Sequence, residues 1–455
     1  MQKIKKTVDM TEGPFFKKML VFAIPIILTG LLQCLYNAAD LVVVGQFRGD
    51  LAVAAVGSTG SLTNLIVGLF MGLSVGAGVC VAHHIGSKEP EEVKKVLHTS
   101  VLLSLICGVA IAAVGFFFSG TFLALMDTPP EVLPLATLYM KIFFLGAPGA
   151  MLYNYIAAMM RSAGDSKHPL IFLAISGVVN ILLNVFLIVV FDMGVDGVAI
   201  ATITSQYLSA IMATVYLIRQ DGPLHLSFGK LRIHGEKLKK ILHIGIPSGI
   251  QGMLFSLSNV LIQSSINSFG DAVVAGSAAS ASLEGFLYIA MNSVYHVALT
   301  FIGQSVGARK FKNIKPLAIY SSILVTAIGM IGGALVLLCH GPLVSLYVSS
   351  EASTAAAMQR LWIIGSTYWL CGLMEVFCAA LRALDRSVTA MIISLGGACG
   401  FRILWIETLF RAFPSPEIIY ISYPISWIIT LAFHLIFTIV VSKKMIRKYE
   451  GVALK

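Results

Sequence analysis

Four carboxylates lie inside long apolar runs of this chain, where a charge is costly. They are Asp40, Glu284, Glu375 and Glu407. An ionised side chain at the centre of a bilayer costs roughly 2.5–3.5 kcal/mol even on the permissive insertion scale. Each acid therefore needs an ionic partner, a wet cavity or a bound proton, and such a residue is by default a functional candidate.

Asp40 has the most polar surroundings of the four. Gln33, Asn37 and Asp40 follow at i, i+4 and i+7, and Tyr36 lies four residues before Asp40. This spacing places the four side chains on one face of a helix. Two more polar stripes follow in the same half of the chain: Ser176, Asn180 and Asn184, then Thr202, Ser205, Gln206 and Ser209.

Three polar faces in an apolar setting are best satisfied when they turn toward one another around a small wet cavity. We therefore predict that Asp40 takes up a proton or a sodium ion and releases it as its hydration changes. The alternative is a protonated Asp40 that only fixes helix packing. The residues predicted to surround the ion are Tyr36, Asn37, Asn180, Asn184 and Thr202.

The acids of the second half have less polar neighbours. Glu284 follows a run of small residues and is expected to face a cavity. Glu375 either does the same or pairs with Arg402 or a backbone group. For both acids, function and structural pairing stay open, while Glu407 is expected near the membrane interface. Arg360 is expected to reach toward the surface by snorkelling.

The composition indicates a membrane protein. Of the 455 residues 57% are hydrophobic and 12% are charged, against about 25% charged in soluble proteins. Runs of about 20 apolar residues can each span a bilayer. Twelve are found, at 18–44, 51–82, 96–119, 133–157, 169–191, 195–218, 240–266, 273–303, 316–339, 354–380, 388–411 and 417–441.

The net charge of +10 follows the topology and does not indicate nucleic-acid binding. Of the 32 Lys and Arg residues, 27 lie in the two termini and the even-numbered connections. By the positive-inside rule both termini are cytoplasmic. The first run is too long for a signal-peptide core, and the seven cysteines form no CxxC pair, so neither disulfides nor metal are expected.

The two halves of the chain repeat each other. Pro25 matches Pro247 at an offset of 222, and Arg161 matches Arg382 at an offset of 221, at equivalent cytoplasmic helix ends. We predict an all-α fold of twelve helices in two pseudo-symmetric six-helix bundles related as parallel repeats. The predicted domains are a lobe at 1–218, a linker at 219–239 and a lobe at 240–455.

Duplicated six-helix units are typical of transporters whose lobes rock to expose one site alternately to either side. Prolines inside helices remove a hydrogen bond and bend the helix, so a hinge at Pro25 and Pro247 is predicted, with static kinks as the alternative. Five polar, aromatic and methionine side chains are predicted to form a substrate surface: Gln33, Tyr36, Met71, Tyr288 and Met291. For each of them, core packing is the alternative.

Several motifs together resemble the multidrug and toxic compound extrusion (MATE) family over essentially the whole chain. They are Ile24-Pro25, Tyr36-Asn37-Ala38-Ala39-Asp40, Arg161-Ser162-Ala163-Gly164-Asp165 with Asn180, Gly194-Val195-Asp196-Gly197 through Thr202, and Tyr423-Pro424-Ile425-Ser426-Trp427.

The resemblance implies efflux of small organic, often cationic, compounds against inward proton or sodium flow, without an enzymatic activity or a cofactor. It implies a coupling ion at Asp40, Asn180 and Thr202, whereas Asn184 stands where many relatives carry a second Asp. In other members acids of the C-terminal lobe contribute, for which Glu284 and Glu375 are candidates. A monomer in a bacterial plasma membrane is expected.

Three alternatives remain. A flippase for a lipid-linked saccharide usually carries several cavity arginines, but only Arg402 lies clearly within a span. An intramembrane enzyme would need a nucleophile or metal motif, which the sequence does not show. A passive channel is disfavoured by the repeated kinks and by an acid in a single lobe, because Ile262 stands at the position equivalent to Asp40.

Overall fold

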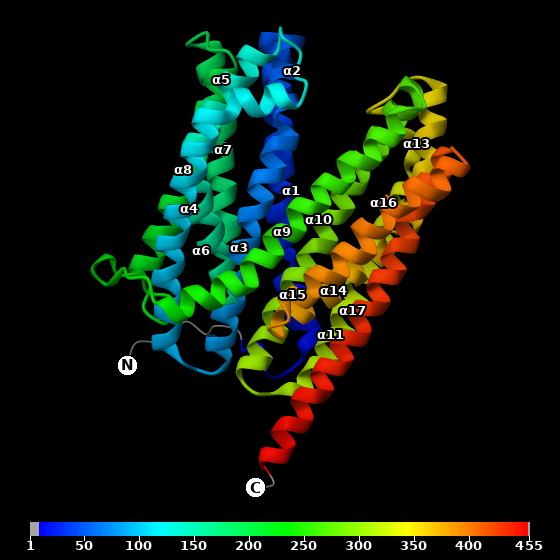
Figure 1. Ribbon diagram of the computed structural model, residues 1–455. Helices are drawn as coiled ribbons and strands as arrows, with labels where there is room; N and C mark the ends of the chain where they lie inside the picture. Colours follow the sequence, from blue (N-terminus) through cyan, green and yellow to red (C-terminus); the bar gives the residue numbers. More distant parts are fainter. Residues whose placement is uncertain (1–8, 454–455) are drawn as a thin grey trace. The chain divides into compact units, whose positions relative to one another are not determined.

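A computed structural model describes residues 9–453, apart from the side chains of residues 50, 61, 64–67, 69–70 and 449–453. These residues form helices and connections without a strand (Figure 1). The first half contains α1 (Phe15–Arg48), α2 (Asp50–Ser58), α3 (Gly60–Gly86), α4 (Pro90–Leu125), α5 (Leu133–Leu145), α6 (Ala147–Ser162), α7 (Lys167–Val189), α8 (Val195–Arg219) and η1 (Phe228–Lys230).

The second half starts with α9 and ends with a long C-terminal helix. Its elements are α9 (Gly235–Asn267), α10 (Asp271–Gly307), η2 (Phe311–Asn313), α11 (Ile314–Leu338), α12 (His340–Ser345), α13 (Glu351–Ile363), η3 (Gly365–Thr367), α14 (Trp369–Ala383), α15 (Ser387–Ser394), η4 (Leu395–Gly400), α16 (Phe401–Trp405), η5 (Ile406–Phe410) and α17 (Pro416–Ala453). Of these, η4 and η5 are π-helical segments.

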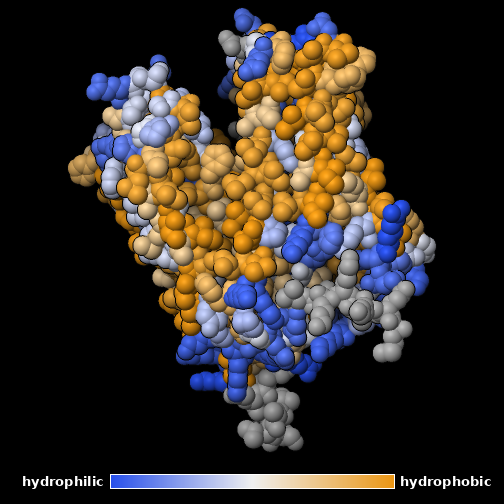
Figure 2. All heavy atoms as spheres, turned by 180° about the vertical axis from the view of Figure 1, so that it is seen from behind, coloured by the Kyte–Doolittle hydropathy of each residue, from blue (hydrophilic) through white to orange (hydrophobic). Residues whose placement is uncertain are grey.

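The predicted all-α membrane fold is confirmed. Among the described residues, nine helices are long and apolar enough to cross a membrane, and two bent helix pairs raise this to eleven. The remaining predicted span, 51–82, is divided between α2 and α3. Figure 2 shows apolar side chains along the helices and hydrophilic ones gathered toward the ends, as a bilayer requires.

The fourth helix of each repeat is broken, which the apolar runs at 133–157 and 354–380 do not reveal. The chain bends by 49° between α5 and α6 and by 42° between η3 and α14. At the first break Gly146 is followed by Pro148 in the first turn of α6, where proline cannot continue the preceding hydrogen bonds. The two breaks lie at equivalent places in the repeats.

The chain divides into two compact units, and each is described by itself. Residues 24–249 form the first unit, and residues 10–23 group with residues 250–453 in the second. The boundaries therefore pass through α1 and α9, within a few residues of Pro25 and Pro247, rather than through the 219–239 connection. Both helices continue through their proline, and the hinge at these sites stays a prediction.

The 219–239 connection is docked on the first unit by polar contacts. The backbone N–H of Ser227 donates to Nε2 of His98 in α4 at 3.2 Å. Lys237 Nζ lies 2.5 Å from Oε2 of Glu92, also in α4. The connection thus covers one end of the first unit.

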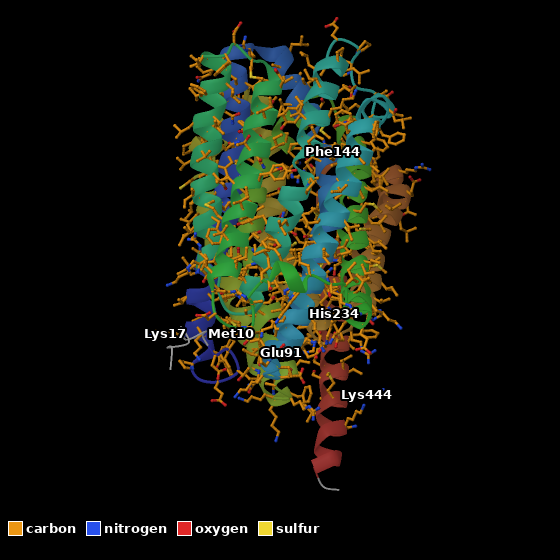
Figure 3. All side chains as sticks on the ribbon, turned by 90° about the vertical axis from the view of Figure 1, so that its left-hand side faces the viewer. Met10, Lys17, Glu91, Phe144, His234 and Lys444 are labelled. Carbon is orange, nitrogen blue, oxygen red and sulfur yellow. The ribbon has the colours of Figure 1, made fainter. Side chains whose placement is uncertain are left out.

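Charged groups gather at this end of the first unit. Figure 3 shows Glu91 and His234 there, with Phe144 far along the helices toward the other end. The ring of His84 lies 2.8 Å from Glu89 Oε2, and this hydrogen bond lowers the pKa of the Glu89 carboxyl. Glu89 therefore stays ionised at neutral pH, as suits a helix end in the aqueous phase.

Candidate functional site

Asp40 lies where α1, α7 and α8 of the first unit meet. Its side chain is buried, with 7% of the residue exposed. Asn184 Nδ2 in α7 donates to Asp40 Oδ1 at 2.5 Å, and Thr202 Oγ1 in α8 donates to Asp40 Oδ2 at 3.2 Å. Three helices thus converge on one carboxyl, and polar stripes from all three take part.

The Thr202 hydroxyl gives Asp40 a partner in either protonation state. Thr202 Oγ1 is also 2.9 Å from the carbonyl oxygen of Val198, and a hydroxyl has one proton to donate but can also accept. When Asp40 is ionised, Thr202 can donate to it. When Asp40 is protonated, its O–H can donate to Thr202, which then donates to Val198.

The polar side chains near Asp40 carry oxygen atoms that can serve a cation. Asn184 Nδ2 also donates to Asn180 Oδ1 at 3.3 Å, while Oδ1 of the fully buried Asn184 has no hydrogen-bond partner. Carboxylate, amide and hydroxyl oxygens are the ligands that hard cations prefer. With a single carboxylate, this set matches the charge of a proton or a monovalent ion.

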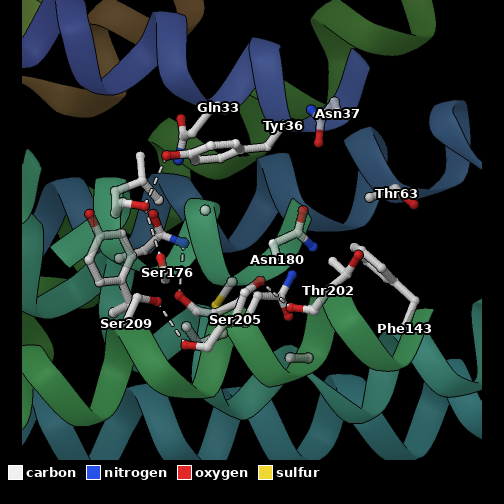
Figure 4. A pocket seen from close by; sticks show the side chains of 18 of the residues that line it. Gln33, Tyr36, Asn37, Thr63, Phe143, Ser176, Asn180, Thr202, Ser205 and Ser209 are labelled. Atoms are coloured by element: carbon white, nitrogen blue, oxygen red, sulfur yellow. Dashed lines mark hydrogen bonds between the residues drawn. The ribbon is translucent and has the colours of Figure 1, made fainter. Parts of the chain in front are cut away.

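A cavity of about 380 Å³ opens beside Asp40, inside the first unit. Figure 4 shows polar side chains from α1, α7 and α8 directed into it, with Phe143 at its edge. Its lining combines polar and apolar side chains, as sites for small organic molecules do. The lining residues used below are Gln33, Tyr36, Asn37, Asp40, Met71, Phe143, Phe144, Gly177, Asn180 and Thr202.

Tyr36 is held in the cavity wall by close packing against α7. Its hydroxyl donates to the carbonyl oxygen of Leu173 at 3.1 Å. A Cβ added at Gly177 would lie 1.7 Å from Cζ of the Tyr36 ring. Only glycine at position 177 allows the ring to lie flat against the α7 backbone, which fixes the aromatic face beside Asp40.

We expect Gly177→Val to destabilise the first unit by about 1–3 kcal/mol, the usual cost of overpacking a filled site. Displacement of the Tyr36 ring should also weaken binding in the cavity. Gly57→Ala is the control, because a Cβ at that helical glycine meets nothing within 4 Å. Thermal unfolding of the purified protein in detergent tests this, and equal unfolding temperatures for both variants would contradict it.

The structure brings most predicted residues of the first lobe to one place. Gln33, Tyr36, Asn37, Met71, Asn180 and Thr202 line the cavity with Asp40. Asn184 lies behind Asp40 and contacts it directly. Met291 and Tyr288 belong to α10 of the second unit, where Met291 is buried and Asn292 Nδ2 donates to the Tyr288 hydroxyl at 3.3 Å.

Glu284 is paired with Arg360, and the expected surface position of Arg360 is wrong. Arg360 Nε and Nη2 donate to the two carboxylate oxygens of Glu284 at 2.9 and 2.8 Å. Arg360 Nη1 donates to Ser277 Oγ at 2.7 Å, and only 6% of Arg360 is exposed. A bidentate buried partner holds the guanidinium inside the helix bundle, so it does not snorkel.

Glu375 in α14 forms neither a hydrogen bond nor an ion pair with the described residues, and the predicted pairing with Arg402 is absent there. Arg382, about two turns further along the same helix, is buried and donates to the Tyr295 hydroxyl and to Gln251 Oε1. Arg382 lies in the last turn of α14, at the predicted helix end, where the dipole stabilises a cation. The side chains of Tyr295 and Gln251 hold it there in addition.

The apolar wall of the cavity could not be recognised from the sequence. Phe143 and Phe144 at the end of α5 and Asn154 in α6 line the cavity, but aromatic residues in an apolar run are equally expected in a core or against lipid. The sequence signal for this wall is a pair of glycines, one at a helix break and one at a close helix contact. The bend at Gly146 turns α5 and α6, and Gly108 allows the backbone of Pro148 to pack closely on α4.

Comparison with protein families gives one match in each repeat. The family model described as MatE matches residues 25–186 and 247–406. The two matches begin 222 residues apart, the offset between Pro25 and Pro247.

The chain is also similar to curated proteins and to solved structures. It is 28% identical over 439 residues to "Probable multidrug resistance protein YoeA" of Bacillus subtilis, covering 93% of this chain and 94% of the relative. It is 23% identical over 386 residues to "Multidrug export protein MepA" of Staphylococcus saprophyticus, covering 84% and 85%.

One solved structure shows the same fold over nearly all of the chain. It is described as the outward-facing conformation of a multidrug resistance MATE family transporter of the MOP superfamily. The TM-score is 0.90 at 20% identity, with 98% of this chain and 100% of that chain covered. At this identity the likeness shows the fold alone.

Proposed function

This chain belongs to the MatE family, and we propose that it exports small organic compounds, mostly cationic ones, in exchange for inward protons or sodium ions. The observation that carries the proposal is the buried Asp40, which accepts hydrogen bonds from Asn184 Nδ2 and Thr202 Oγ1 at the wall of a cavity that Asn180 also lines. Two relatives whose names refer to multidrug resistance and export support the choice of cargo.

The coupling ion binds at Asp40 from the outer side of the membrane. Either ion neutralises the carboxylate, and Thr202 and Asn184 rearrange their hydrogen bonds to the new state. Neutralisation lowers the cost of keeping Asp40 buried, since an ionised carboxyl loses several kcal/mol of hydration there. Binding of the ion thus favours a tighter packing of α1 against α7 and α8.

An organic cation and the coupling ion compete for the same negative charge. The cavity offers a cation the Asp40 carboxylate, while Phe143, Phe144 and Met71 offer its apolar body an adaptable surface. Binding free energies are reciprocal, so the ion weakens binding of the compound as much as the compound weakens binding of the ion. Alternating opening of the two lobes to either side then exchanges them across the membrane.

The location and orientation follow from the charge distribution. We place the protein in the plasma membrane of a bacterium, as a monomer with both termini in the cytoplasm. The docked 219–239 connection and its basic residues then lie on the cytoplasmic side, in agreement with the positive-inside rule.

Export from vesicles tests the exchange itself. Purified protein is reconstituted into vesicles, and a fluorescent organic cation is added outside. A pH gradient or a sodium gradient of either direction is then imposed across the vesicle membrane. A gradient of one pH unit stores about 1.4 kcal/mol per proton, which drives roughly tenfold accumulation in a one-to-one exchange. Accumulation driven by one of the gradients is expected, and no response to either gradient would refute antiport.

Asn184→Asp should strengthen cation binding at this site. The substitution places a second carboxylate at hydrogen-bond distance from Asp40, and two such charges must share a proton or a cation. We expect half-saturation at a lower sodium or proton concentration and slower release, hence slower export. Binding isotherms for radioactive sodium and for protons measure this, and an unchanged affinity for both would contradict the placement of Asn184.

A further inference from the structure

Arg402 of the second unit lies in an unusual stretch of backbone. It belongs to α16, a segment of five residues between the π-helical segments η4 and η5. A π-turn widens the helix by one residue, is rare, and occurs mostly at functional sites. Two such segments on either side of one arginine turn its side chain away from the direction that a regular helix would give it.

The Arg402 guanidinium is buried and lacks an acidic partner. Only 4% of the residue is exposed, and its one hydrogen bond runs from Nε to Ser426 Oγ in α17 at 2.8 Å. None of the described acids forms an ion pair with it. Arg360, by contrast, has all its charge matched by Glu284.

The terminal nitrogens of Arg402 are without a hydrogen bond but are not fully enclosed. Several buried polar atoms of the described residues are shut off without a partner, and Nε of Arg382 is among them, but Nη1 and Nη2 of Arg402 are not. These two atoms are therefore not fully enclosed, and they make no hydrogen bond with the described residues. They form the outer edge of the guanidinium and can donate side by side to one ligand.

An aromatic surface supports the guanidinium. Its Cζ lies 4.1 Å from the centre of the Tyr423 ring and 5.8 Å from that of Trp427. Tyr368 packs edge-on against Trp427 with ring centres 5.3 Å apart. Stacking of a desolvated cation on aromatic rings is favourable, but it offsets only part of the cost of burying the charge. The site is thus short of one negative charge.

We propose that Arg402 binds the carboxylate of an exported compound, with the aromatic body of that compound packed near Tyr423. A carboxylate is planar and accepts two parallel hydrogen bonds, which matches the two free nitrogens. It is also a monoanion, which matches the single charge of the Arg402 guanidinium. A phosphate dianion would need a second free cation, and Glu284 already occupies Arg360.

This inference rests on the proposed export of small organic compounds and extends its cargo to compounds that carry a carboxylate. A zwitterionic compound can bind in two separate steps. In one step its cationic part binds at Asp40 of the first unit, and in the other its carboxylate binds at Arg402 of the second unit. Compounds without a carboxylate do not use Arg402. The two classes should therefore respond differently to the loss of this side chain.

Two fluorescent dyes that differ by one methyl ester separate the classes: rhodamine 110, a free acid, and rhodamine 123, its methyl ester. We expect Arg402→Gln to slow export of rhodamine 110 by roughly tenfold or more, the usual effect of losing a charged hydrogen bond, and to leave export of rhodamine 123 unchanged. Arg402→Lys keeps the charge but loses the two parallel N–H donors, so its rate of rhodamine 110 export should lie between those of the wild type and Arg402→Gln. Arg386→Gln, the same change at an exposed arginine, is the control.

Equal slowing of both dyes by Arg402→Gln would overturn the proposal. If the Arg402→Gln variant does not fold, a test on the wild-type protein replaces it. Benzoate should raise the unfolding temperature of the wild-type protein by mass action, whereas methyl benzoate at the same concentration should not, and equal effects would again overturn it. Failure of the wild type to export rhodamine 123 would count against the proposed function alone, since benzoate binding does not depend on export.

Discussion

Asp40→Asn is expected to lose gradient-driven accumulation of organic cations entirely while it still folds. Asparagine keeps the shape and one acceptor oxygen, so Asn184 and Thr202 retain a partner. It cannot take up a proton, and it offers a cation no net charge. A gradient of one pH unit that gives the wild type roughly tenfold accumulation should give this variant none, as measured by dye uptake in reconstituted vesicles.

The matched control for that result is Asp127→Asn. Asp127 lies in the exposed connection after α4 with a φ of 56°, a backbone conformation that asparagine tolerates as well as aspartate does. The control should transport as the wild type does. Accumulation by Asp40→Asn at the level of Asp127→Asn would remove Asp40 from the coupling mechanism.

The largest loss of stability is expected from Arg360→Met in the second unit. Removing one partner leaves Glu284 buried and uncompensated, which costs about 3–5 kcal/mol. The double variant Glu284→Gln with Arg360→Met should recover much of that loss, because no charge then remains to be buried. Denaturant unfolding in mixed micelles measures the free energy of unfolding for each variant.

A surface pair provides the comparison. Arg411 and Glu407 form an ion pair at 2.6 Å whose side chains are 70% and 50% exposed. Arg411→Met should therefore cost at most about 1 kcal/mol. Two results would contradict a stabilising role for the buried Glu284–Arg360 pair. One is a loss of unfolding free energy in Arg360→Met no larger than that in Arg411→Met, and the other is a double variant less stable than Arg360→Met alone.

Much of the site around Asp40 could be predicted from the sequence, because its polar residues are rare and regularly spaced. Asn180, Asn184 and Thr202 stand out in apolar helices, and the need to satisfy them fixes the faces that α7 and α8 turn toward Asp40. The apolar wall could not be predicted in this way, since Phe143 and Phe144 have no such constraint. Their position depends on the bend at Gly146, which arises from packing as much as from residue type.

The basic residues of the second unit show where sequence spacing is insufficient. Arg360 and Arg382 lie near the ends of apolar runs, so solvent or the helix dipole was the simpler partner for each. Their actual partners, Glu284 and Gln251, come from helices far away in sequence. No pattern along one helix reveals such a pairing, because the rotation of each helix is set by its neighbours.

The two repeats share a broken fourth helix and differ in their charges. Ile262, the residue equivalent to Asp40, is buried among Met374, Trp427 and other apolar side chains of the second unit. Asp40 is a buried acid of the first unit, whereas Arg402 is a buried arginine of the second unit that pairs with none of the described acids. This asymmetry suits cargo whose opposite charges are recognised in different lobes.

Exchange at Asp40 is tested most directly by the ion released when an organic cation binds. Purified protein in weakly buffered detergent solution is mixed with the cation, and protons are followed with a pH dye while displaced radioactive sodium is followed in parallel. The wild type should release one of the two ions in proportion to the compound bound, and Asp40→Asn should release neither. Binding of the compound to the wild type without release of either ion, or equal release by Asp40→Asn, would contradict competition at Asp40.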